Sequence, residues 1–197
     1  MKSMKMDKLT LFLIPIGVAV NFVGGQIAIL LHLPLYLDAI GTIVVGALCG
    51  GLPGAIVGLI SNVLNSITSP ITMAYAILSI LFGLVSAYAS KKNVFKNLLK
   101  TMLISLLFAF IGGVMGACIT WLISGGDFGP ITAGSYAAII YEFTKLPAFL
   151  CQVIAEFGMD LLDKFVTLVV VFFVLKSMPN RFLAKLPLGG IYATEEE

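Results

Sequence analysis

Four ionisable side chains lie close together in the last apolar stretch of the chain, AEFGMDLLDKFVTLVVVFFVLKSMP. Asp160, Asp163 and Lys164 follow Glu156 at i+4, i+7 and i+8. In a helix of 3.6 residues per turn, these spacings place all four on one face. Such a face could bind a polar substrate. Alternatively, Asp160 and Lys164 could form a structural ion pair, with Glu156 lying among lipid headgroups.

The composition indicates that this face belongs to a membrane protein. Of the 197 residues, 59% are hydrophobic and 11% are charged, whereas a soluble domain carries about 25% charged residues. We therefore expect an integral membrane protein in which Lys176 marks the cytoplasmic end of the last helix. Asp160 lies sixteen residues before Lys176, which is about 24 Å along a helix. At that depth, in the outer part of the hydrocarbon core, ionisable groups usually face a cavity or a partner.

The apolar stretches predict an all-α fold, with a bundle of six transmembrane helices in a single membrane domain over residues 1–197. The expected helices are 9–31, 38–50, 53–67, 70–89, 98–123 and 147–176. The second and third are short for a membrane span, and the Gly/Pro turn CGGLPG separates them. The first apolar stretch is longer than the core of a cleaved signal, so we interpret it as a retained helix.

The basic residues predict the orientation of this bundle. Ten lie on the side of the termini and two on the other side. The ten are Lys2, Lys5, Lys8, Lys91, Lys92, Lys96, Lys100, Lys176, Arg181 and Lys185, and the two are Lys145 and Lys164. This positive-inside bias predicts cytoplasmic termini. It supports an even number of crossings rather than six in particular.

Further polar and aromatic residues collect at the expected outer level of the bundle. They are Tyr36, Asp38, Asn62, Asn65, Thr72, Tyr75 and Trp121. Singly, the aromatic residues suit a membrane interface, the asparagines suit helix ends, and Asp38 suits the N-cap of the second helix. Their convergence favours an outward-facing pocket. The long outer segment ISGGDFGPITAGSYAAIIYEFTKLP can form a short helix through SYAAIIYEF, and we interpret it as a lid.

The sequence offers little for catalysis or metal binding. His32 is the only histidine, and an interfacial or pocket-lining role suits it better than that of a base or ligand. Cys49, Cys118 and Cys151 lie in apolar sequence without a CxxC pair, so we expect buried free thiols. There is no Walker A motif, so the chain by itself cannot use ATP. We expect no enzymatic activity, no cofactor and no metal.

The segment LPLYLDAIGTIVVGALCGGLPGAIVGLISNVLNS resembles the second and third helices of S components, the substrate-binding subunits of energy-coupling factor (ECF) transporters. In that family, a run similar to L-D-x-I-G-T precedes a Gly-Pro turn, a small-residue helix and an asparagine near the helix end. The matching residues are Asp38, Gly41, Thr42, Gly46, Gly54, Gly58 and Asn62. The length, the six-helix plan and DLLDK at the head of the last helix agree, so the resemblance covers most of residues 9–180.

This resemblance implies a high-affinity binding subunit for a vitamin or related micronutrient in a prokaryotic cell membrane. Its partners would be a membrane scaffold subunit and two ATPase subunits. The first helix would meet the scaffold through small residues, here the looser stripe Gly17, Asn21, Gly24 and Ala28. The substrate-binding candidates are Tyr36, Asp38, Asn62, Asn65, Thr72, Tyr75, Trp121, Glu156, Asp160, Asp163 and Lys164.

The candidate residues also favour a class of substrate. The aromatic side chains offer stacking surfaces, and the acidic surplus suits a neutral or cationic ring. We expect a small aromatic vitamin, either a vitamin B6 form or a thiamine-related pyrimidine, and cobalamin stays open. Two other classes of protein also stay open. One is a stand-alone secondary transporter that uses Asp160 and Glu156, and the other is a structural protein without a ligand.

Overall fold

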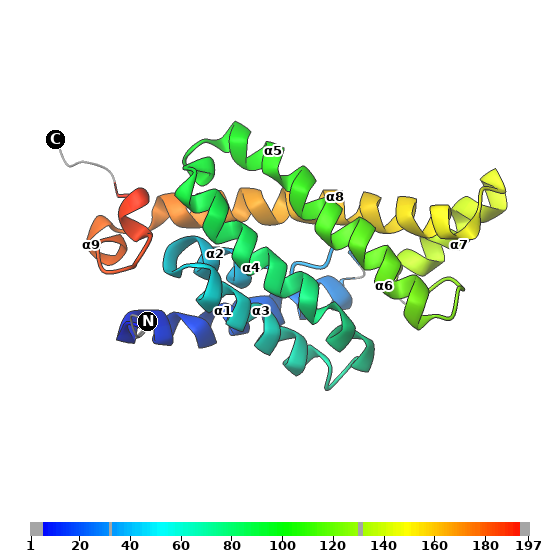
Figure 1. Cartoon of the computed structure of the whole chain (residues 1–197), viewed down its shortest axis with the longest axis horizontal. Helices are drawn as coiled ribbons and strands as arrows, with labels where there is room; N and C mark the ends of the chain where they lie inside the picture. The colour runs from blue at the N-terminus through cyan, green and yellow to red at the C-terminus, as the bar shows by residue number, and fades with distance from the viewer. Residues whose placement is uncertain (1–5, 32, 130–131, 194–197) are drawn as a thin grey trace, which may run out of the picture.

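The computed structural model describes residues 6–31, 33–129 and 132–193, and every regular element in these ranges is helical (Figure 1). The long elements are α1 Lys8–Leu30, α2 Ile40–Cys49, α3 Gly51–Asn65, α4 Ala76–Lys91, α5 Leu98–Ala109, α6 Gly116–Ile123, α7 Thr132–Thr144 and α8 Ala148–Ser177. The shorter ones are η1 Pro70–Tyr75, η2 Val94–Lys96, η3 Phe110–Met115, α9 Asn180–Leu183 and η4 Gly189–Ile191. The all-α prediction is confirmed for the described residues. Lys2, Lys5 and His32 lie outside them.

The boundaries of the helices follow local sequence signals. Gly50 has φ +105° and separates α2 from α3, as expected for the Gly/Pro turn. Pro53 lies in the first turn of α3, where its missing N–H is not needed. The expected helix 98–123 is one rod that contains a π-helical turn, η3, between α5 and α6.

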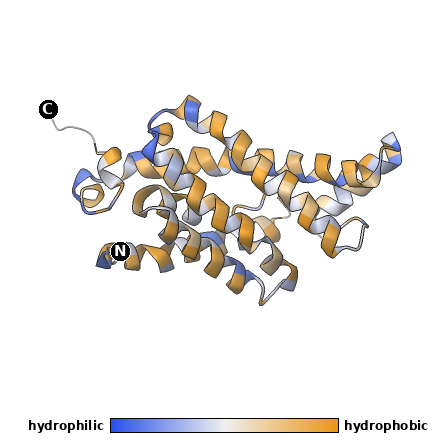
Figure 2. Cartoon of the chain, in the orientation of Figure 1, coloured by the Kyte–Doolittle hydropathy of each residue, from blue (hydrophilic) through white to orange (hydrophobic). Residues whose placement is uncertain are grey.

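Within the described ranges, three helical stretches are long and apolar enough to cross a membrane: Lys8–Leu30, Pro70–Lys91 and Leu98–Ile123. Helices α2 and α3 are apolar but shorter. Helix α8 has 30 residues and carries the four ionisable groups within its length. Figure 2 shows mostly hydrophobic helices, with hydrophilic residues concentrated near the turns. This arrangement is compatible with insertion into a membrane.

Helix α8 runs along most of the molecule, from the end that carries α6 and α7 to the end that carries α9 (Figure 1). Helices α1 to α4 pack against one another, and α2 also reaches α8. The α5–η3–α6 rod and α7 pack directly on α8. Ile43, Leu48, Phe108, Leu168 and Val171 are fully buried in the core cluster that these helices share. Helix α8 is therefore positioned by contacts on several sides.

The small-residue stripe of α1 lies inside the molecule. Gly17, Asn21 and Ala28 are buried and Gly24 is half-buried. Gly17 packs against α2, and a Cβ atom on Gly24 would collide with the carbonyl oxygen of Leu37. Small residues permit close helix approach, but here the neighbour is the same chain. The structure therefore places the stripe in internal contacts rather than on a surface for a scaffold.

Asn21 of this stripe caps helix α2 in place of Asp38. The predicted Asp38 cap was wrong, because α2 begins at Ile40 and its N-cap position, Ala39, has no side-chain hydrogen bond. The Asn21 Oδ1 accepts from the N–H groups of Gly41 (2.7 Å) and Thr42 (3.4 Å), both in the first turn of α2. Its Nδ2 donates to Thr42 Oγ1 (2.8 Å) and Ser61 Oγ (3.0 Å). We call Asn21, Gly41, Thr42 and Ser61 the Asn21 network; it joins α1, α2 and α3.

Candidate binding site

The four ionisable residues of α8 lie on one buried face of the helix. Glu156 is 2% exposed, Asp160 5%, Asp163 0% and Lys164 2%. Gln152 precedes Glu156 by one turn and is also fully buried. The spacing predicted this shared face correctly. Because Glu156 is enclosed by protein, the alternative that places it among headgroups is not supported.

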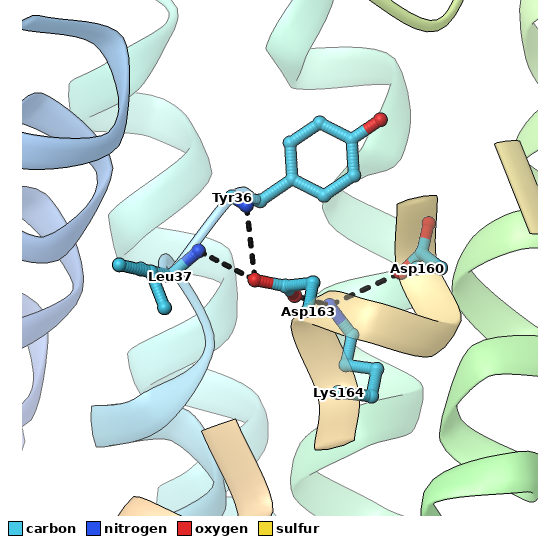
Figure 3. A network of polar contacts seen from close by, with 5 residues as sticks. All are labelled: Tyr36, Leu37, Asp160, Asp163 and Lys164. Atoms are coloured by element: carbon cyan, nitrogen blue, oxygen red, sulfur yellow. Dashed lines mark hydrogen bonds and ion pairs between the residues drawn. The ribbon is translucent and has the colours of Figure 1, made fainter. Parts of the chain in front are cut away.

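Lys164 lies at the centre of an ion-pair cluster (Figure 3). Its Nζ is 3.1 Å from Asp160 Oδ1 and also pairs with Asp163 Oδ2. The ammonium group lies over the ring of Phe82, 4.8 Å from its centroid. Buried ammonium groups are stable only when they are paired and hydrogen-bonded. Asp160 and Asp163 together meet that requirement.

Asp163 also attaches the α1–α2 loop to α8 (Figure 3). Its Oδ1 accepts from the backbone N–H groups of Tyr36 (2.9 Å) and Leu37 (2.8 Å). Leu37 has φ +53°, a left-handed conformation that is uncommon for a leucine. Such strain costs about 1–3 kcal/mol and persists only where neighbours stabilise it. Here the neighbours are the Asp163 carboxylate and the close approach of Gly24.

A second polar group surrounds Glu156. Gln152 Nε2 donates to Glu156 Oε1 at 2.8 Å. The hydroxyl of Thr120 lies against the Glu156 carboxylate and is 2.7 Å from the Tyr75 hydroxyl. This chain of contacts joins η1, α6 and α8. Tyr75 is half-buried, whereas Thr120, Gln152 and Glu156 are buried.

Glycines of the η3–α6 segment make room for the carboxylates. A Cβ atom on Gly112 would collide with the Asp160 carboxylate, and one on Gly116 would lie 2.9 Å from Glu156 Oε2. The two glycines and the two carboxylates share the spacing i, i+4, so they match across the helix interface. π-helical turns occur frequently at functional sites. Sequence reasoning missed these glycines, Thr120 and Gln152; the G-x-x-x-G spacing in GGVMG was the available signal.

Four other candidate residues make hydrogen bonds or ring contacts within the chain that account for their positions without a ligand. Asn62 Nδ2 donates to Ser79 Oγ (2.6 Å) and Gly58 O (3.0 Å), joining α3 to α4. The backbone carbonyl of Asn65 accepts at the end of α3. Thr72 Oγ1 donates within the turn at η1. Trp121 packs edge-on against the ring of Phe149, at 5.5 Å between centroids.

Tyr36 and Asp38 lie beside the Lys164 cluster. The Tyr36 ring is 5.9 Å from Lys164 Nζ. Asp38 is half-buried and interacts electrostatically with Lys164 and Asp163. The structure thus gathers Tyr36, Asp38 and Tyr75 around the α8 face.

The outer segment forms helix α7, as its sequence predicted. It folds back onto α8, where Ala137 is buried with Cys151 and Ala155. Lys145 adopts φ +52° at the turn between the two helices. Its side chain pairs with Glu142 at 2.8 Å in the solvent-exposed turn. The lid function of this segment stays a prediction.

Other features lie apart from this site. The three thiols are free; Cys49 and Cys151 are buried as expected, but Cys118 is exposed. In the described part of the chain, no group of three or more His, Cys, Asp or Glu residues is placed to hold a metal ion. An apolar groove of about 500 Å³ lies on the other half of α8, lined by residues such as Val170, Phe173 and Met178.

Comparison of the chain with models of known protein families, with curated proteins and with solved structures found no match. The geometry of the site is therefore the basis for assigning a function.

Proposed function

We propose that this chain is the high-affinity substrate-binding subunit of an ECF-type importer for a small aromatic micronutrient. The observation that carries the proposal is the polar face of α8, where Glu156, Asp160, Asp163 and Lys164 are ionisable and buried inside the bundle. Ionisable groups inside a membrane are costly and usually mark a substrate or ion pathway. The alternative, a structural ion pair between Asp160 and Lys164 that Asp163 joins, accounts for these three residues but not for Glu156 and Gln152.

The proposal places six helices across a prokaryotic cell membrane, with cytoplasmic termini. The ten-to-two distribution of basic residues supports this orientation. The start of α1 and helix α9 lie at the same end of the molecule (Figure 1), as an even number of crossings requires. The resemblance to S components implies that transport would need a membrane scaffold subunit and two ATPase subunits; the sequence itself has no Walker A motif.

The α8 face divides into a supporting part and a binding part. Asp163 holds the α1–α2 loop, and Lys164 pairs with both Asp163 and Asp160. Glu156 and Asp160 face the glycines of η3 and α6. One ammonium group, Lys164, shares this face of the helix with three carboxylates, two of which pair with it. That surplus of negative charge favours a neutral or cationic ligand. We therefore assign Glu156, Asp160, Thr120 and Tyr75 to the substrate.

A binding screen tests this function. The purified chain in detergent is heated with a panel containing pyridoxine, pyridoxamine, thiamine, riboflavin, folate and cobalamin. A ligand present at a hundred times its Kd should add about 2.7 kcal/mol to the stability of the folded state. Tight binding without an ion gradient, together with no uptake by the chain alone in proteoliposomes, is the expected result.

Two outcomes would contradict the proposal. Gradient-driven uptake by the chain alone would make it a secondary transporter that uses Asp160 and Glu156. If no compound of the panel stabilises the chain, it is not a vitamin-binding subunit of the proposed kind.

A further inference from the structure

The amide of Gln152 has one polar atom that is paired and one that is not. Its Nε2 donates to Glu156 Oε1 at 2.8 Å, whereas its Oε1 is buried without a hydrogen-bond partner among the described residues. The residue itself is fully buried. Buried polar atoms are nearly always paired, so an unpaired one calls for an explanation. Because the two polar atoms share one amide carbon, the unpaired oxygen lies next to the Glu156 carboxylate.

The neighbouring groups provide no donor for this oxygen. Thr120 is already in contact with Tyr75, Glu156 and the carbonyl of Gly116. The Lys164 ammonium, the nearest cation along α8, pairs with Asp160 and Asp163 and lies about three turns from Gln152. An unpaired neutral acceptor, Gln152 Oε1, therefore lies beside the Glu156 carboxylate inside the bundle.

We infer that Gln152 and Glu156 form an acceptor pair that selects a ligand with a cationic nitrogen bearing N–H groups, such as a protonated amine or a protonated aminopyrimidine. Such a group can donate to Gln152 Oε1 and Glu156 together, and its charge balances the carboxylate. Hydrogen bonds in which the donor or the acceptor is charged are stronger than those between neutral groups. This inference rests on the proposed function, and it narrows the substrate to amino-substituted rings.

Matched ligands test the chemistry. Thiamine and oxythiamine differ by an amino group replaced with a carbonyl, and pyridoxamine and pyridoxine differ by an ammonium group replaced with a hydroxyl. The amino member of the bound pair should bind about ten- to hundred-fold more tightly, because its amino group can donate to both acceptors at once, whereas a hydroxyl can donate to one and a carbonyl to neither. Affinities are measured by isothermal titration calorimetry on the full chain.

Variants locate the effect. Gln152→Met should lower the preference for the amino ligand by about three- to ten-fold, since it removes one neutral acceptor. Thr167→Val is the matched control: Thr167 Oγ1 is also buried and unpaired on α8, but it lies beyond Lys164 and away from Glu156. The control should leave the preference unchanged. If Gln152→Met also leaves it unchanged, for instance because water pairs with the amide, the inference is overturned.

The screen separates the failure of this inference from the failure of the function. If the tightest ligand of the panel has no amino group, the chain is still a vitamin-binding subunit, but the acceptor pair does not select the substrate. If no panel compound binds at all, the proposed function and the inference both fail.

Discussion

Two buried polar networks join helices of this bundle, and they differ in charge and in completeness. The Asn21 network connects α1, α2 and α3 through neutral groups, and both polar atoms of the Asn21 amide are hydrogen-bonded. The α8 face connects α8 with the α1–α2 loop and with η1 and α6 through three carboxylates and one ammonium group. On that face, Gln152 Oε1 has no hydrogen-bond partner.

The difference separates support from function. A neutral network whose polar atoms are all paired holds helices in register and leaves nothing for a ligand. Under the proposed function, a charged network with surplus carboxylate and an unpaired oxygen is completed when a ligand binds. The resemblance to S components includes Gly41 and Thr42, which both belong to the Asn21 network. Gly41 and Thr42 of the sequence pattern therefore indicate packing between helices of this chain rather than contact with a substrate.

The largest effect should come from breaking the charged network. Lys164→Met leaves Asp160 and Asp163 buried without their cation, and removing one partner of a buried pair costs about 3–5 kcal/mol. Thermal unfolding in detergent measures the loss. Lys145→Met is the control, because the exposed Lys145–Glu142 pair is worth about 0–1 kcal/mol. Equal melting temperatures for the two variants would mean that the cluster does not stabilise the fold.

An intermediate effect should come from the neutral network. Asn21→Ala removes the cap of α2 and leaves buried donors unpaired, which costs about 1–3 kcal/mol. The affinity of the folded fraction for its ligand should stay within about two-fold, because Asn21 belongs to the support. Asn65→Ala is the control, since the bonds described for Asn65 use its backbone carbonyl. A large loss of affinity in Asn21→Ala, without loss of stability, would remove the distinction between the two networks.

The smallest effect should come from a third, peripheral contact. The hydroxyl of Tyr192 donates to Ser90 Oγ at 2.7 Å, and Ser90 Oγ donates to the carbonyl of Ala47 at 2.7 Å. Tyr192→Phe should cost about 0.5–1.5 kcal/mol. Tyr88→Phe provides the control, because Tyr88 is 64% exposed. Equal stability of the two variants would show that the C-terminal segment is not held by this hydroxyl.

The same contact predicts a dependence on pH. Burial raises the pKa of Tyr192 to about 12, above an unfolded value of about 10. The fold therefore favours the neutral phenol, and this stabilisation is complete below about pH 10 and is lost as the pH rises towards 12. A difference titration of tyrosinate absorbance between wild type and Tyr192→Phe should show a midpoint near 12. A midpoint near 10 would mean that Tyr192 is exposed.

Local sequence patterns predicted the elements and one face of the site. The i, i+4, i+7 and i+8 spacing placed Glu156, Asp160, Asp163 and Lys164 together, because helical periodicity depends on neighbours in the chain. The Gly/Pro turn after α2 and the helix within the outer segment follow from similarly local preferences. The predicted N-cap failed at Asp38, where a side chain from another helix supplied the hydrogen bonds instead.

Contacts between distant segments were decided only by the tertiary structure. Asp163 meets the N–H groups of Tyr36 and Leu37 across separations of 127 and 126 residues, and Gly112 meets Asp160 across a helix interface. Composition and periodicity determined that this chain is helical, apolar and charged along one helix face. They could not determine which neighbour each small or polar residue meets, because that depends on how the helices pack, and packing is a property of the whole chain. For the same reason, the sequence could show that the small-residue stripe of α1 permits another segment to approach closely. Only the fold showed that this segment is α2 together with the loop that precedes it.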